Sequence, residues 1–290
     1  MKISAPFFKL NKYKKNITSQ FGEDGIIDYL IKTSKTKILK NCIEFGAHDG
    51  ITNSNTYNLW KNHNYNCLLI EDNKERYDKL FEFVKSNQNV KAINQFVGFE
   101  KSNSLEKIIK DSDFFSSKEV GVLSIDIDSH DYKIFKNLTF SPQIIVIEFN
   151  NSIPGHIDYS DPDDELFLRC SAKAIQNLGY KKGYYTVACT VTNCLLIRED
   201  CFNKKAHPNL PVEYLLDYEA MKLNNDYLYN IVHSQSISSK PIFTKPVNKL
   251  DRIYFNISRF LMSKFGIRKE KFIHPNQSIR KKLNDSDLYF

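Results

Sequence analysis

The sequence predicts an α/β fold built on a doubly wound, mostly parallel sheet of seven strands. Seven short apolar runs between residues 40 and 198 alternate with segments of helical periodicity. Several of these runs are continuous rather than alternating in polarity, which is typical of strands that are buried on both faces. Because strands that alternate with helices favour a parallel sheet covered by helices, an open doubly wound architecture is expected.

The expected strands are recognised by their apolar residues and by the polar turns between them. The continuous runs LLI, VLSIDI and IIVIEF mark strands that are expected to be buried on both faces. The last two strands are expected to pair with each other and to close the series. The seven expected strands are 40–45, 66–71, 90–97, 120–127, 143–149, 184–189 and 193–198.

The expected helices lie between these strands and before the first of them. In 73–86, apolar residues recur at spacings of three and four, as on one face of a helix. Segments 23–33, 131–138 and 165–178 have the same pattern. Gly179 follows the last of these segments and is expected to cap its C-terminus.

The last third of the chain has a different character, so we expect a main domain at 1–200 and a mostly helical extension at 201–290. Segment 241–282 contains eleven lysines and arginines but only two acids. Apolar residues between Leu250 and Leu261 fall at helical spacing, which indicates one amphipathic helix. Two interpretations stay open: a helix packed on the domain, or a peripheral contact with a membrane surface or polyanion.

Composition and cysteine usage indicate a soluble cytoplasmic protein. The chain of 290 residues is 41% hydrophobic and 26% charged, with a net charge of +7. It has no apolar run long enough to span a membrane and no convincing signal peptide. Its six cysteines show no CxxC spacing, so we expect buried thiols in a reducing compartment.

The segment CIEFGAHDG at 42–50 is the central motif. It places an acid, Glu44, at the end of an expected strand and follows it with a glycine-containing turn. Ligands of open α/β sheets bind beyond the carboxyl ends of strands, and glycines at 46 and 50 let a ligand approach the backbone. The pattern E-x-G-x-x-x-G differs from the G-x-G-x-x-G of nicotinamide-binding turns.

Glu71 ends the second expected strand, about 20 residues after the glycine turn. An acid in this position can bind both hydroxyls of a ribose. The neighbouring Asp72 fits the alternative role of capping the helix that follows. The two acids are therefore expected to divide these tasks.

A third group of polar residues follows the fourth and fifth expected strands. Carboxylate and amide oxygens suit Mg²⁺ or Mn²⁺, and a divalent metal is expected at Asp126, Glu148 and Asn150. Helix capping by Asp128 and Asp131 without a metal is the alternative, as is acid–base use without a metal. His130 is a candidate general base because its pKa lies near working pH. The candidate catalytic residues are Asp126, Asp128, His130 and Asp131.

These motifs together resemble the FkbM-type branch of methyltransferases that use S-adenosylmethionine (SAM). The resemblance covers roughly residues 18–200, and Ser129-His130 departs from its usual pattern. The segments that carry it are SQFGEDG (19–25), IEFGAHDG (43–50), SNT (54–56), LIE (69–71), SIDIDSHDY (124–132) and VIEFN (146–150).

The resemblance implies a Rossmann-like fold of the class I methyltransferase type, SAM as cofactor, and methylation of a sugar or related hydroxyl. Glu44, Gly46 and the loop Asn53–Thr56 would contact the methionine part of SAM, and Glu71 its ribose. Asp126, Asp128 and Asp131 would face the substrate. The expected cofactor-binding residues are Gln20, Asp24, Glu44, Gly46, Asp49, Gly50, Asn53, Asn55, Thr56 and Glu71.

Two other classes of function compete with this interpretation. One is a nucleotide-dependent oxidoreductase, which the missing G-x-G-x-x-G disfavours. The other is a non-catalytic module that docks on a membrane or polyanion through its basic tail.

We expect a small-molecule or glycan substrate, such as a precursor in surface polysaccharide biosynthesis, and no nucleic acid. The sequence leaves open whether the chain forms a homo-oligomer.

Overall fold

The computed structural model describes residues 9–127, 129–162, 168–218 and 220–221. The chain divides into two compact units, Met1–Asn150 with His156–Leu216, and Asn151–Gly155 with Asp217–Phe290. The elements discussed below belong to the first unit. The predicted amphipathic helix at Leu250–Leu261 and the basic segment around it lie outside the described residues.

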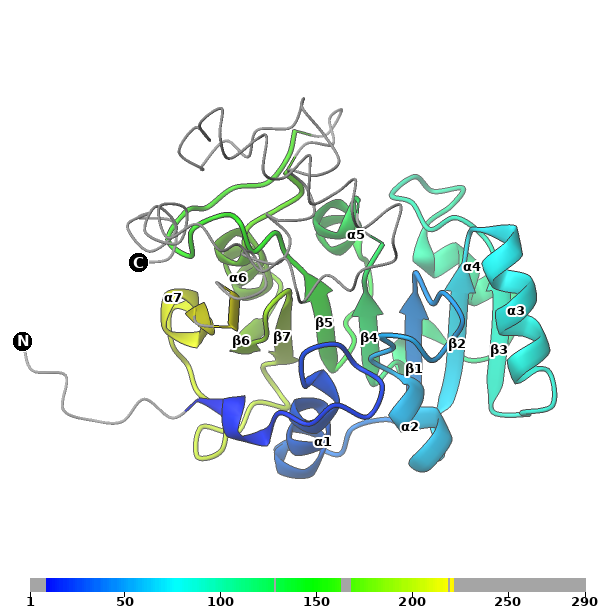
Figure 1. The fold of residues 1–290 in the computed structure, drawn as a ribbon, viewed down its shortest axis with the longest axis horizontal. Coiled ribbons are helices and arrows are strands. Elements are labelled where there is room, and N and C mark those ends of the chain that lie inside the picture. The colour runs from blue at the N-terminus through cyan, green and yellow to red at the C-terminus, as the bar shows by residue number, and fades with distance from the viewer. Residues whose placement is uncertain (1–8, 128, 163–167, 219, 222–290) are drawn as a thin grey trace, which may run out of the picture. The chain divides into compact units, whose positions relative to one another are not determined.

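A seven-stranded sheet forms the centre of the first unit (Figure 1), with the strand order β3-β2-β1-β4-β5-β7-β6. Neighbouring strands from β3 to β5 are parallel, and β7 runs antiparallel to both β5 and β6. The predicted fold class is therefore confirmed, including the closing pair. The strands are β1 (Asn41–Phe45), β2 (Asn66–Glu71), β3 (Val90–Asn94), β4 (Val122–Ile125), β5 (Ile144–Glu148), β6 (Tyr184–Cys189) and β7 (Asn193–Arg198).

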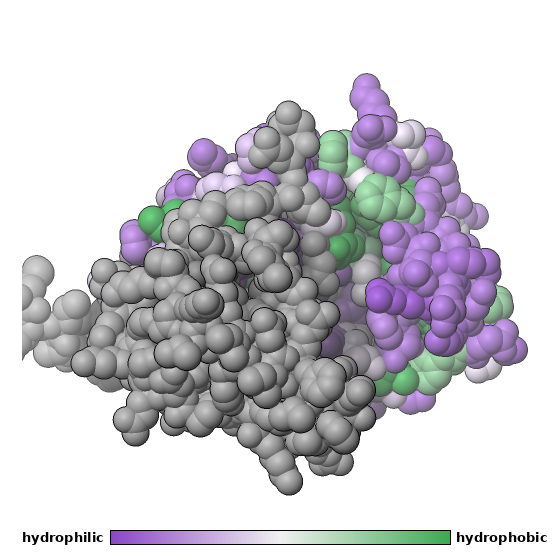
Figure 2. All heavy atoms as spheres, turned by 45° about the horizontal axis from the view of Figure 1, so that its top comes forward, coloured by the Kyte–Doolittle hydropathy of each residue, from purple (hydrophilic) through white to green (hydrophobic). Residues whose placement is uncertain are grey.

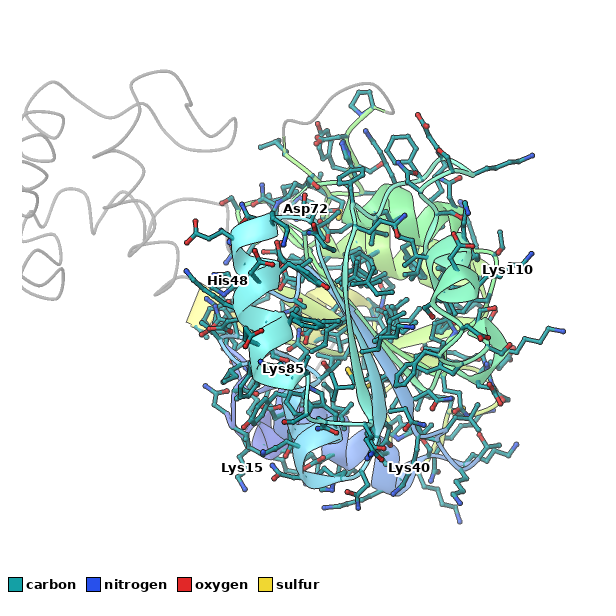
Figure 3. The ribbon with its side chains drawn as sticks, turned by 90° about the vertical axis from the view of Figure 1, so that its right-hand side faces the viewer. Lys15, Lys40, His48, Asp72, Lys85 and Lys110 are labelled. Atoms are coloured by element: carbon teal, nitrogen blue, oxygen red, sulfur yellow. The ribbon has the colours of Figure 1, made fainter. Side chains whose placement is uncertain are left out.

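Helices cover both faces of this sheet because its strands are apolar on both sides. The helices α1 (Glu23–Thr33), α2 (Tyr57–Asn62) and α3 (Lys74–Val84) pack Leu30, Leu59 and Leu80 into one buried cluster with strand residues such as Cys42. The opposite face carries α4 (Leu105–Ser112), α5 (Asp131–Asn137) and α6 (Ala172–Lys181). In Figure 3, Lys85 at the end of α3 and Lys110 in α4 lie on opposite sides of the sheet.

The outer face of α3 is charged, with exposed ion pairs between residues four apart, such as Lys79 with Glu75. Figure 2 shows the resulting hydrophilic surface at this side of the unit. Such exposed pairs contribute little to the stability of a helix, because water and salt screen them. The helix is therefore held mainly by its buried residues Leu80 and Val84.

Several predicted boundaries were wrong, and each difference has a local cause. The strand β3 ends at Asn94 instead of residue 97, and α6 begins at Ala172 instead of residue 165. The Ser171 hydroxyl caps α6 by accepting a hydrogen bond from the backbone N–H of Ala174. Gly179 lies inside α6 rather than capping it, and a Cβ at this position would lie 2.5 Å from the side chain of Leu196 on β7. Two short helices, α2 and α4, were not predicted.

The compact unit continues past the expected boundary at residue 200. The Gln176 side chain in α6 donates to the Leu210 carbonyl and accepts from the Val212 N–H. These bonds fix the segment that leads into the short helix α7 (Val212–Leu215). Residues 201–216 are therefore part of the first unit.

All six cysteines are buried and unpaired by disulfides, which confirms their interpretation as buried thiols. Among the described helices, none has the length and apolar character required to cross a membrane.

Candidate functional site

A cavity of about 370 Å³ opens at the carboxyl ends of β1, β2, β3 and β4. Its volume falls in the range of about 300–1,000 Å³ that is usual for small-molecule sites. Figure 3 shows His48 and Asp72 towards the same end of the unit, and Lys40, which precedes β1, at the other. The lining residues are Glu44, Phe45, Gly46, Ala47, His48, Thr52, Asn53, Ser54, Ile70, Glu71, Asp72, Arg76, Gln95, Phe96, Val97, Asp126, Ile127 and Ser129.

The turn after β1 requires glycine at position 46. Gly46 has a positive φ of 75°, and a Cβ there would lie 1.9 Å from the carbonyl oxygen of Asp126. No rotation of a side chain could relieve a contact with backbone, so glycine is needed for two reasons at once. The turn after β1 and the end of β4 therefore meet main chain to main chain on the cavity wall.

The Glu44 carboxylate holds the loop that forms one side of the cavity. It accepts hydrogen bonds from the Ser54 hydroxyl at 2.5 Å, the Thr56 hydroxyl at 2.7 Å and the Asn55 N–H at 2.8 Å. Burial raises the pKa of Glu44, and these donors oppose the rise. The same loop contains Asn53, whose positive φ of 59° places it on the cavity wall. The hydrogen bonds of Glu44 thus hold the loop at 53–56 in place beside the cavity.

Glu71 uses its carboxylate differently. Glu71 is only 2% exposed. Each of its two carboxylate oxygens accepts one backbone N–H, from His48 at 2.8 Å and from Asn73 at 3.0 Å. Each oxygen keeps a second lone pair for a ligand in the cavity. A carboxylate presented in this way can accept from two adjacent hydroxyls at once.

A loop before α1 closes against the Asn53–Ser54 side of the cavity. One carboxylate oxygen of Asp24 accepts the backbone N–H groups of Ile17, Thr18 and Ser19 at 2.8–3.0 Å. The Thr18 hydroxyl donates to the Ser54 carbonyl at 3.1 Å. Asp24 therefore holds this loop through hydrogen bonds to its backbone and does not line the cavity. Gln20, another predicted cofactor residue, is exposed and is also absent from the lining.

The remaining predicted cofactor residues support the cavity wall. Asp49 accepts from the N–H groups of Ile51 and Thr52; burial alone would raise its pKa, but these bonds lower the pKa to about 2. Gly50, with a φ of 78°, gives room to Leu80. Asn55 and Thr56 bond Ser124 and Glu44 respectively, and neither lines the cavity.

On the β4 side, Asp126 lines the cavity and Asp131 does not. The Asp131 carboxylate is buried and accepts from the N–H groups of Ile127 and Ser129 at 2.9 and 3.2 Å. Burial raises the pKa of Asp131, and these bonds together with Arg169 oppose the rise. Asp131 therefore shapes the loop after β4, and Asp128 lies outside the described residues.

Two of the predicted metal ligands make bonds to other residues. Glu148 forms an ion pair with Arg169, and the Asn150 side chain donates to the Leu168 carbonyl at 3.1 Å. In the part of the chain that the structure describes, no three histidine, cysteine or acidic side chains are grouped as a metal would require. A divalent cation stays a prediction without a described ligand set.

His130 also lies away from the cavity lining. Its ring packs edge-on against Phe99, with ring centres 5.5 Å apart. Burial and the nearby Lys133 lower its pKa, so the ring is neutral near pH 7. A neutral imidazole can accept a proton, but the cavity lies beside Ser129 rather than beside this ring. Its proposed use as a base stays untested.

The sequence analysis missed a wall of the cavity formed by Gln95, Phe96 and Val97. These residues were expected inside the third strand, at 90–97, whereas that strand ends at Asn94, just before Gln95. The change from apolar alternation to the polar pair Asn94-Gln95 was the available signal. Thr52 and Arg76 were missed because each follows the motif residues by several positions in a loop or helix.

The strand order and the single reversed strand give the chain the Rossmann-like fold of class I methyltransferases. The sequence of this chain matches no protein-family model and no curated protein.

Several solved structures match part of this chain at low sequence identity. One is a SAM-dependent methyltransferase from Aquifex aeolicus, at 11% identity and a TM-score of 0.37, over 61% of this chain and 88% of that chain. A second, from Clostridium acetobutylicum, has 13% identity and a TM-score of 0.36, over 61% and 90% of the two chains. Monomeric WbdD has 11% identity and a TM-score of 0.39, and the match covers 76% of this chain and 58% of WbdD. The likeness concerns the fold alone.

Proposed function

We propose that this chain is a SAM-dependent methyltransferase that acts on a hydroxyl of a sugar or related glycan precursor. The observation that carries the proposal is Glu71, whose carboxylate ends β2 at the cavity with one lone pair open on each oxygen. A pair of acceptors at this spacing suits the two hydroxyls of a ribose.

The other walls of the cavity fit the remaining parts of such a cofactor. Ile70, Phe96 and Val97 offer apolar contact for a flat ring near Glu71. On the other side, Gly46 brings its backbone to the cavity wall without a side chain of its own. The motif lacks the three-glycine turn of nicotinamide sites, which argues against the oxidoreductase alternative.

When bound, SAM supplies a methyl group on a sulfonium, and transfer breaks the carbon–sulfur bond as the acceptor oxygen forms a new bond to carbon. The chain must hold the acceptor in line and take its proton. Asp126 lies on the cavity wall, and its backbone carbonyl packs closely against Gly46. We assign the proton to the Asp126 carboxylate, with Asp131 acting as a positioning residue for the loop. Alignment and a placed base can together account for a large part of the rate enhancement.

The acceptor class rests on the FkbM-type motifs, above all SIDIDSHDY at 124–132 and VIEFN at 146–150. All three predicted substrate-facing acids, Asp126, Asp128 and Asp131, lie in the first of these segments and follow β4 in the chain. The sugar hydroxyl is thus proposed from the resemblance, and the cofactor from the cavity.

The test is calorimetric titration of the whole chain with SAM and with S-adenosylhomocysteine. We expect micromolar binding by the wild type and at least about 100-fold weaker binding by Glu71→Ala, because two hydrogen bonds to a charged group are lost. The matched control is Glu75→Ala, an exposed acid on α3 that pairs with Lys79. Absence of binding by folded wild-type protein, or equal binding by Glu71→Ala, would overturn the proposal; NAD in the mass spectrum of the purified protein would then favour the oxidoreductase.

A further inference from the structure

A second cavity, of about 460 Å³, lies along β6 at the far end of the sheet. Four strands separate β6 from β2 in the strand order. The groove runs between α6 and the segment 209–211, with β6 between them. No residue that lines it also lines the cavity at β1 and β2.

The walls of this groove are held in place by internal contacts. Gln176 bonds both Leu210 and Val212 at 2.9 Å, which ties the 209–211 segment to α6. Lys173 on the same helix pairs with Glu213 at 3.0 Å. The groove is therefore a formed feature of the first unit.

Thr186 supplies a polar group that lacks a partner. The residue is 4% exposed, and its hydroxyl makes no hydrogen bond within the described part of the chain. A buried hydroxyl left unpaired costs about 1–3 kcal/mol, so such groups usually mark a bound water or ligand. Since Thr186 lines the groove, a ligand there can satisfy it.

Two tyrosine rings, those of Tyr180 and Tyr185, also line this groove. Tyr180 is 71% exposed, although it is a large ring, and stands edge-on to Tyr185 with centres 6.3 Å apart. Tyr185 is itself fixed by stacking on Phe202 at 4.2 Å. On the same wall, the Asn177 amide donates to Asp158 at 2.7 Å, which places an amide and a carboxylate together.

We propose that this groove binds a neutral saccharide. Sugar rings present apolar C–H faces to aromatic rings and hydroxyls to amide, carboxylate and hydroxyl groups, and the groove carries each of these. A polyanion is disfavoured because Glu213 pairs with Lys173, and Asp158 offsets the charge of Lys181, the other lysine of the lining. Addition of a strand to the edge of β6 is disfavoured by the irregularity between Thr186 and Ala188.

The site does not depend on the methyltransferase proposal, because it shares no residue with the first cavity. Saturation-transfer and heteronuclear NMR titrations of the whole chain would use maltose, cellobiose, mannobiose and chitobiose as probes. We expect millimolar binding of at least one, with chemical-shift changes in α6 and β6. Tyr180→Ala should weaken it about fivefold to tenfold, while Phe81→Ala, an exposed aromatic on α3, should not.

Thr186→Val separates a ligand site from a merely structural position. Removing an unpaired buried hydroxyl should leave the thermal midpoint unchanged or raise it, while saccharide binding falls. The inference is overturned if none of the four probes binds, if both variants bind as the wild type does, or if inorganic phosphate displaces the sugar. Titration with S-adenosylhomocysteine reports separately on the first cavity.

Discussion

The carboxyl edge of the sheet has two halves, one at β1 and β2 and the other at β4 and β5. The acids that end β2 and β5 have different partners. Glu71 ends β2 and Glu148 ends β5, and both follow an uninterrupted apolar strand. Glu71 receives only backbone donors and keeps its other lone pairs for the cavity. Glu148 is committed to an ion pair with Arg169. An acid at a strand end is therefore a ligand group only where its own partners leave it lone pairs.

The largest expected effect concerns Asp126, the acid of the β4 half that lines the cavity. Asp126→Asn should lower turnover by about 10²–10⁴-fold, because the proton acceptor is lost. Its affinity for S-adenosylhomocysteine should stay nearly unchanged. The measurement is the initial rate of S-adenosylhomocysteine formation with a glycan acceptor. Asp111→Asn, an exposed acid paired with Lys107, is the control, and wild-type turnover in Asp126→Asn would rule out this role.

The next effect separates Glu44 from Glu71 within the first half. Glu44→Ala leaves three buried donors without an acceptor, and we expect a loss of about 3 kcal/mol or more in the free energy of unfolding. Glu71→Ala leaves two backbone N–H groups that water in the cavity can reach, so about 1 kcal/mol is expected. Urea denaturation of both variants measures the difference. Equal losses would mean that Glu71 is as structural as Glu44.

A smaller loss of stability is expected when the ion pair at the end of β5 is broken. Arg169→Ala removes the partner of Glu148, which is mostly buried, and should cost about 1–2 kcal/mol of stability. It should not alter the affinity for S-adenosylhomocysteine, which calorimetry can check beside denaturation. A tenfold loss of that affinity in a folded variant would show that the two halves are not separate.

The smallest effect is a pH dependence from Asp49. Its folded pKa of about 2 lies below the ordinary value of 3.8, so its contribution is complete above pH 4 and is lost as the pH falls towards 2. Since 35% of the side chain is exposed, we expect only about 1 kcal/mol. Thermal midpoints of wild type and Asp49→Asn should converge at low pH. A constant difference between pH 5 and pH 2 would contradict the low pKa.

The strands and the positions of their ends were predictable from the sequence, because burial on both faces demands continuous apolar runs. The strands β2, β6 and β7 were predicted to the residue, and Glu71 was placed at the ligand edge. The partners of each acid were not predictable, since Arg169 reaches Glu148 across 21 residues of chain. Asp24 illustrates the same limit: its type and position pointed to the cavity, whereas its carboxylate faces three backbone amides behind the loop.

The contact between Gly46 and the Asp126 carbonyl has a consequence for how such an enzyme can change its acceptor. The two halves of the edge are coupled there through main chain alone, at a point where even a methyl group does not fit. Side chains in the loop after β4 can therefore be exchanged without moving the turn after β1. For directed evolution, position 46 would be left untouched, and a library at Ile127 and Ser129, which line the cavity, would vary the acceptor while the proposed cofactor site stays in place.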